Sequence, residues 1–168
     1  ARFDFDKAKW FNQQYLTQMS GSELAALITD KKYDVSDEYL AASCELMKAR
    51  IEKVDDVYTN GYYLFEGVKS YDEKNVRKRF KVENQPTIEA LIDRLASLET
   101  YAAEPIETTV KTYLEETGLK FGDVLPVLRL ALAGIMNGPS VFDMMALIGS
   151  DEVKRRMTDG FIAFNNTI

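Results

Sequence analysis

The stretch 124–157, VLPVLRLALAGIMNGPSVFDMMALIGSDEVKRRM, decides the fold of this chain. Its first apolar residues recur at three- and four-residue steps, which places them on one face of a helix: Leu125, Leu128, Leu132 and Ile135. A glycine and a proline in the segment 137–140 then break that helix. A second stripe follows, formed by Phe142, Met145 and Ile148, and a glycine at position 149 ends it. The stretch therefore predicts the core of a helical bundle.

Helical patterns continue on both sides of this stretch. Apolar residues spaced as on one helix face predict helices over 5–19, 36–54, 86–98 and 105–117, and a tail helix as far as Phe164. Ser20 and Ser70, each followed three residues later by glutamate, are typical capping boxes, and Ser36 is a good N-cap. Residues 62–65 could form a short extended piece.

No segment alternates apolar and polar residues as a half-buried strand does. We therefore predict an all-α fold, a helical bundle or cage of two small subdomains. The turn-rich region around Asn60 and Gly61 separates them, so the boundaries are 1–68 and 69–168.

The composition excludes several function classes. The 168 residues contain no histidine, which removes the usual general base and the usual zinc ligand. Cys44 is the only cysteine and lies on a helical stripe, so it is expected to be a buried hydrophobe in a reducing, cytoplasmic protein. No apolar run is long enough to cross a membrane. The formal net charge of −6 argues against DNA or general nucleic-acid binding on totals alone.

Neither a catalytic site nor a metal site is visible. No glycine-rich phosphate loop is present, and acidic neighbours such as Asp55 and Asp56 point about 100° apart on a helix, so they do not converge on one atom. The chain has nineteen aromatic residues (9 Tyr, 9 Phe, 1 Trp), and several that stand beside polar or basic residues could stack on single-stranded bases. For Phe80 and Phe142 the helical spacing favours a core role instead. Two basic clusters, 77–81 and 154–156, are typical of solvated helix faces.

Several strings in this order resemble the C-terminal part of bacterial-type glutamyl-tRNA synthetases. FDFDKAKWFNQQYL resembles the segment that follows the KMSKS loop in that family. ELMKAR with a later YYLF resembles the next helical portion, and LRLALAG followed by GPSVF resembles the anticodon-facing end. The resemblance covers most of the chain and implies the anticodon-binding part of a glutamate–tRNA ligase, without the catalytic domain.

The resemblance also assigns residues, position by position. Arg50 matches an arginine associated with tRNA base 34, and Arg129 matches another arginine that contacts the anticodon. The turn that packs on the anticodon bases corresponds to Gly138, Pro139, Val141 and Phe142. Lys111 stands where the family can have arginine, and it keeps the charge without the planar fork. Contacts with the inner corner of the tRNA are implied for Lys9, Trp10, Asn12 and Tyr15.

The partners implied by the resemblance are tRNA(Glu) and the catalytic domain of the parent enzyme, while the parent's ATP and Mg²⁺ are bound outside this chain. Read from the residues alone, a helical protein-interaction scaffold without an RNA role stays an alternative. For Arg129 the alternative is an internal salt bridge to an acid such as Asp143.

Overall fold

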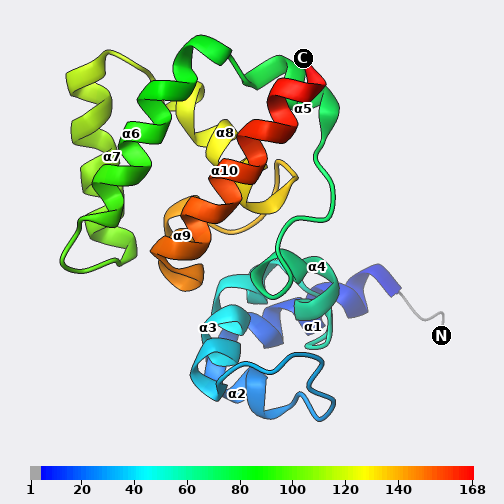
Figure 1. Cartoon of the computed structure of the whole chain (residues 1–168). Coiled ribbons are helices and arrows are strands. Elements are labelled where there is room, and N and C mark those ends of the chain that lie inside the picture. The colour runs from blue at the N-terminus through cyan, green and yellow to red at the C-terminus, as the bar shows by residue number, and fades with distance from the viewer. Residues whose placement is uncertain (1–4) are drawn as a thin grey trace. The chain divides into compact units, whose positions relative to one another are not determined.

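A computed structural model describes residues 5–168, with side chains described from residue 12 onwards. Within that range the chain consists of α-helices and short 3-10 turns, with no strand, which confirms the all-α prediction (Figure 1). The packing divides the chain into two compact units, 1–65 and 66–168, whereas the predicted boundary follows residue 68. The two units are described in turn.

The first unit is built on a pair of short helices. It contains α1 (Phe5–Gln18), α2 (Gly21–Ala26), α3 (Asp37–Met47), the 3-10 turn η1 (Lys48–Arg50), α4 (Asp56–Asn60) and the 3-10 turn η2 (Tyr62–Leu64). Ser20 and Glu23 form the predicted capping box of α2, and the Ser36 hydroxyl accepts from the amide of Tyr39 as the predicted cap of α3. Gly21 lets α2 approach α3 closely, because a Cβ there would lie 2.1 Å from the Ala41 carbonyl oxygen.

The expectation of an extended piece at 62–65 was wrong. The backbone there is a 3-10 turn, in which the amides of Leu64 and Phe65 donate to the carbonyls of Gly61 and Tyr62 at 2.9 Å. The turn is held from outside as well, because the Tyr39 hydroxyl donates to the Leu64 carbonyl. These local bonds satisfy backbone groups that a lone extended segment would leave without partners.

Cys44 is fully buried in the core of the first unit, as expected from its helical stripe. It shares that core with Leu24, Leu40, Met47 and Ile51, each of which is 0–1% exposed. Burial raises the pKa of the Cys44 thiol to about 11, so the thiol stays protonated and unreactive near neutral pH.

The second unit packs its helices around two central ones. It contains α5 (Glu73–Arg79), the 3-10 turn η3 (Val82–Asn84), α6 (Gln85–Ala96), α7 (Ala103–Thr117), α8 (Phe121–Ala133), α9 (Val141–Ile148) and α10 (Ser150–Thr167). In Figure 1 α8 and α10 lie side by side, with α6 and α7 to one side of them. Gly160 of α10 faces Ala131 of α8, and a Cβ at Gly160 would lie 2.9 Å from the alanine Cβ.

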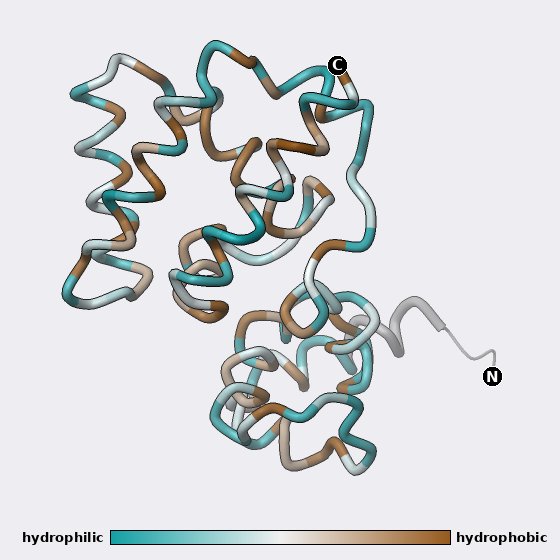
Figure 2. The backbone as a smooth tube through the Cα atoms, viewed as in Figure 1, coloured by the Kyte–Doolittle hydropathy of each residue, from teal (hydrophilic) through white to brown (hydrophobic). Residues whose placement is uncertain are grey.

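Among the helices of the second unit, α8 contributes the most buried residues. Val124, Val127, Leu128 and the four residues 130–133 are all at most 1% exposed. Along the surrounding helices hydrophobic and hydrophilic residues alternate, as Figure 2 shows for the second unit. Helices that each bury one stripe against their neighbours account for this pattern, with α5, α6 and α9 packed on α8 or α10 and α7 packed on α6 and α9.

Three helix ends differ from the prediction. The helix α8 ends at Gly134, which has φ +79°, rather than at 137–140. The N-cap of α5 is Asp72, whose carboxylate accepts from the Asn75 amide at 3.2 Å, in place of Ser70. The tail helix continues to Thr167.

Candidate nucleic-acid interface

A pocket of about 270 Å³ lies beside the turn that joins α8 to α9. Its walls come from both helices and from the turn between them: Leu125, Pro126, Arg129, Met136, Ser140, Val141 and Phe142. The structure thus brings three of the proposed anticodon residues, Arg129, Val141 and Phe142, to one pocket. The lining is mainly apolar with one strong cation, which suits a flat aromatic ligand that carries hydrogen-bond acceptors.

The helix α8 turns one face towards this pocket. Leu125 and Arg129 are four residues apart, so they lie on the same side of the helix. Both are half-buried, whereas their neighbours Val124 and Leu128 are fully enclosed. Leu125, the first residue of the predicted core stripe, therefore lines the pocket and is not part of the core. The Arg129 Nη1 nitrogen is itself buried.

The turn 134–140 has glycines where its backbone needs them. Gly134 and Gly138 have φ values of +79° and +141°, a region that other residues rarely adopt. Pro139 between them and α9 is buried and anchors the turn. The Ser140 side chain makes no capping hydrogen bond to α9. The first amides of α9 are therefore not capped by a side chain, at the end of the helix that carries partial positive charge.

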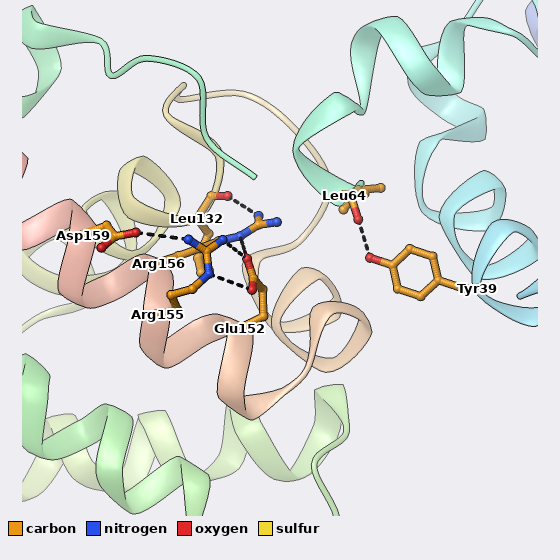
Figure 3. Close-up of polar contacts among 7 residues, drawn as sticks. All are labelled: Tyr39, Leu64, Leu132, Glu152, Arg155, Arg156 and Asp159. Carbon is orange, nitrogen blue, oxygen red and sulfur yellow. Dashed lines mark hydrogen bonds and ion pairs between the residues drawn. The ribbon is translucent and has the colours of Figure 1, made fainter. Parts of the chain in front are cut away.

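One buried cation fastens the end of α8 to α10. Arg156 is 4% exposed, and its Nη1 donates to the Leu132 carbonyl at 2.8 Å (Figure 3). Its Nε donates to the Glu152 carboxylate at 3.0 Å. The Leu132 carbonyl belongs to the last turn of α8, whose carbonyls have no partner further along the helix. Arg156 thus holds α8 two residues before the turn that carries the pocket. The expectation that 154–156 is a solvated face was wrong for this residue.

Glu152 receives two arginines. Arg155 donates to its carboxylate, and the hydrogen bond from Arg155 is the main reason that the pKa of Glu152 lies below its usual value, against the opposing effect of partial burial. Arg155 also donates to Asp159 at 3.1 Å. The surface around Arg156 is consequently a closed set of ion pairs within α10 (Figure 3).

The Glu152 contribution to stability is expected to depend on pH. Because the folded-state pKa is lowered, the contribution is full above the unfolded value of about 4.3 and is lost as pH falls through the folded value. Glu152→Gln should lower the free energy of unfolding by about 1 kcal/mol at pH 7. Urea titrations at several pH values should show the difference from wild type shrinking below about pH 4. A difference that stays constant down to pH 3 would contradict this account.

In the first unit, Arg50 ends the turn η1 on a fixed backbone. Its carbonyl accepts from Asn60 Nδ2 at 3.1 Å, and the Ala49 carbonyl accepts from Gln13 Nε2 at 3.0 Å. Ile51, which follows, is fully buried. Arg50 is itself exposed, so a long cation projects from a turn that is tied on both sides.

The other proposed RNA contacts lie on α1 and α7. Tyr15 is 65% exposed, and Asn12 donates to the Glu52 carbonyl, which ties α1 to the segment after η1. The side chains of Lys9 and Trp10 fall outside the described part of the structure. Lys111 lies on α7, is paired with Glu107 at 3.3 Å, and does not line the pocket.

The described residues form neither a metal-ion cluster nor a membrane-spanning helix. Among the side chains described, those of residues 12–168, no group of three or more from histidine, cysteine, aspartate or glutamate is placed to hold a metal ion. No helix within residues 5–168 has the length and apolar character required to cross a membrane.

Comparison with known proteins shows the family of the chain. The model of the anticodon binding domain family matches residues 9–161, nearly the whole chain. The chain belongs to this family. Among curated relatives, glutamate–tRNA ligases from Porphyromonas gingivalis strain W83 and Flavobacterium johnsoniae are 34% and 32% identical over 161 residues, each covering 94% of this chain. The chain spans about a third of their length, 32% in both cases.

Solved structures agree with the family assignment. A glutamate–tRNA ligase from Elizabethkingia meningosepticum, crystallised with its amino acid, matches 98% of this chain with a TM-score of 0.88 and 36% identity. A glutamate–tRNA synthetase from Elizabethkingia anophelis matches 96% with a TM-score of 0.83 and 37% identity. The chain covers 33% and 32% of those proteins. It is similar throughout to the anticodon-binding part of such enzymes, as the motifs suggested.

Sequence reasoning missed four pocket residues of this anticodon-binding domain: Leu125, Pro126, Met136 and Ser140. One signal could have found Leu125, because it stands four residues before Arg129 and so shares its face. Pro126 interrupts an otherwise apolar helix, which is a second mark of an unusual position. Met136 carries no such signal, since its place depends on where α8 ends.

Proposed function

We propose that this chain reads the anticodon of tRNA(Glu) as part of a glutamate–tRNA ligase. The observation that carries the proposal is the pocket at the α8–α9 turn, which Arg129 and Phe142 both line, in a chain that belongs to the anticodon-binding domain family. The names of the relatives support glutamate as the amino acid and its tRNA as the partner.

The pocket has the chemistry needed for an unpaired base. Phe142 is half-buried, so part of its ring is open to stack on a base, a contact worth about 1–3 kcal/mol. Arg129 is a planar donor that can bond acceptors on a base edge. The amides at the start of α9 can bond a further acceptor or a phosphate oxygen.

The first unit supplies a separate reader. Arg50 projects from a tied turn, and we assign it the base at position 34, where a guanidinium can favour one pyrimidine over the other. Asn12 and Tyr15 of α1, with Lys9 and Trp10, are assigned to the inner corner of the tRNA. Lys111 is a weaker candidate, because Glu107 already pairs with it. Ligation itself, with ATP and Mg²⁺, is assigned to the remaining two thirds of such an enzyme.

The test is selective binding by this chain. Its affinity should be measured for tRNA(Glu) and for the same tRNA with bases 34, 35 or 36 replaced. Each base that is read directly should be worth about 1–3 kcal/mol, a factor of roughly 5–150 in affinity. Phe142→Ala should lower affinity for tRNA(Glu) and reduce the difference between the RNAs.

Phe121→Ala is the matched control, because Phe121 is an exposed phenylalanine at the start of α8 that does not line the pocket. This variant should leave the affinities for all four RNAs unchanged. Equal affinity of the wild-type chain for all four RNAs would end the selective-reader proposal. No effect of Arg50→Gln or Phe142→Ala on any RNA would favour the scaffold alternative.

A further inference from the structure

The basic segment 74–81, KNVRKRFK, stands out in an acidic chain. Five of its eight residues are lysine or arginine and none is acidic, although the chain carries a formal net charge of −6. Lys74, Arg77 and Lys78 are at positions i, i+3 and i+4 of α5 and therefore share one face. All three are exposed, as is Lys81 just beyond the helix. We call Lys74, Arg77, Lys78 and Lys81 the α5 basic face.

The opposite side of α5 is anchored in the core, which holds this face in place. Val76 is fully buried and Phe80 is 5% exposed. The Phe80 ring packs on Phe161 and Phe164 of α10, with centroids 5.9 and 5.4 Å apart. The start of α5 is tied to the end of α8, because the Asp72 amide donates to the Gly134 carbonyl at 2.9 Å. The charges thus project from a rigid support on the same unit as the pocket.

Few carboxylates neutralise these charges. Arg77 has a single partner, an exposed contact of 3.4 Å with Glu73, and no carboxylate oxygen of the described residues lies within 4.0 Å of Lys78 or Lys81. Positive charges at a helix C-terminus are favoured by the helix dipole, which accounts for one or two of them. Like charges four residues apart, as in Lys74 and Lys78, oppose one another instead.

In the second basic cluster, residues 154–156, every cation has a partner within the chain. Lys154 pairs with Asp93 at 3.0 Å, Arg155 with Glu152 and Asp159, and Arg156 with Glu152 and the Leu132 carbonyl. Every cation of that cluster is already bound within the molecule. Of the two clusters, only the α5 basic face is left to meet an outside anion.

We propose that the α5 basic face contacts the phosphate backbone of the tRNA whose anticodon is read at the α8–α9 turn. The inference rests on the proposed function. A chain of net charge −6 repels a polyanion overall, so it needs a local positive surface where the RNA approaches. Lysine, a compact charge on a flexible stem, suits phosphate contact without base selection.

The test compares two double variants that remove the same net charge. Lys78→Gln/Lys81→Gln alters the α5 basic face, and Lys154→Gln/Arg155→Gln alters the internally paired cluster. Affinities for tRNA(Glu) and for its anticodon-replaced form are measured across a salt series. Each lost phosphate contact should reduce the steepness of log K against log salt by about 0.7–0.9. The slope should therefore become shallower by roughly 1.5 in Lys78→Gln/Lys81→Gln and stay unchanged in Lys154→Gln/Arg155→Gln. Circular dichroism should show both variants folded, since all four side chains are exposed.

The outcomes separate this inference from the proposed function. An equal loss of slope on both RNAs, with anticodon discrimination kept, supports the phosphate contact. An unchanged slope in Lys78→Gln/Lys81→Gln overturns it, while discrimination by the wild-type chain would leave the proposed function standing. If the wild-type chain bound both RNAs equally, the proposed anticodon recognition would be overturned. The change in the slope of log K against log salt would still test the phosphate contact. No binding to either RNA at the lowest salt would overturn both.

Discussion

Replacing Gly134 by alanine is expected to destabilise the second unit by at least about 3 kcal/mol. Two costs act together at this position. The backbone has φ +79°, where an L side chain adds roughly 1–2 kcal/mol of strain. A Cβ would also lie 2.1 Å from the Ser70 carbonyl oxygen and 2.8 Å from Val68 Cγ1, so the segment before α5 would have to move.

Gly118 provides a matched control in the same unit. It ends α7 with φ +78°, nearly the same conformation, but a Cβ there meets nothing within 4 Å. Gly118→Ala should therefore cost only the backbone strain, about 1–2 kcal/mol. The two variants are compared by urea denaturation followed by circular dichroism. Equal losses, within about 0.5 kcal/mol, would show that the contact with Ser70 carries no weight.

The Gly134 variant should also affect the pocket. The Gly134 carbonyl accepts from the Asp72 amide, so movement of residues 68–72 displaces the end of α8 from which the turn 134–140 departs. Anticodon discrimination is expected to fall in Gly134→Ala and to persist in Gly118→Ala. The end of α8 at Gly134 is therefore in direct contact with residues 68–72, which are far away in the sequence.

Helix caps that depend only on neighbouring residues could be predicted from the sequence, whereas a helix start that depends on packing against a distant segment could not. The caps at Ser20 and Ser36 depend on residues three positions away, and both were confirmed. The cap expected at Ser70 has the same local pattern, but the Ser70 carbonyl packs against Gly134 and α5 begins at Asp72 instead. The end of α8 was also placed too late, but for a local reason: apolar residues continue to Met136 and hid the stop signal of Gly134, which ends the helix with φ +79°.

Arg156 illustrates the limit for charged residues. A run of lysine and arginine is typical of a solvated face, and Lys154 and Arg155 are indeed exposed. Arg156 is buried because a carbonyl of another helix needs a donor, and no spacing within 150–167 reveals that need. The pocket shows a similar division: Arg129, Val141 and Phe142 came from the family resemblance, whereas composition and periodicity pointed only to a helical core.

Arg156→Met is expected to lower the free energy of unfolding by about 3 kcal/mol. The substitution leaves the Leu132 carbonyl buried without its donor, which costs about 1–3 kcal/mol, and it leaves space where the guanidinium packed. Glu152 is less affected, because Arg155 still donates to it. Arg156→Lys keeps the charge but cannot reach both the carbonyl and the carboxylate with one planar group, so its loss should be intermediate.

Arg155→Met is the control, one residue away on the same helix. Arg155 is exposed, and exposed ion pairs contribute about 0–1 kcal/mol, so this variant should remain close to wild type. Urea denaturation of the three variants gives the order directly. Similar losses for Arg155→Met and Arg156→Met would mean that the bond to Leu132 adds nothing beyond the surface ion pairs.

RNA binding distinguishes a positioning role of Arg156 from a purely structural one. Arg156 is buried and touches no RNA in the proposed arrangement, so the salt dependence of binding should stay unchanged in Arg156→Met measured well below its unfolding temperature. The anticodon selectivity should nevertheless fall, because the freed end of α8 lets Arg129 and the turn 134–140 shift relative to Phe142. Loss of selectivity without loss of salt slope can arise only if the pocket has changed shape while the phosphate contacts remain. Full selectivity in a folded Arg156→Met variant would confine Arg156 to stability.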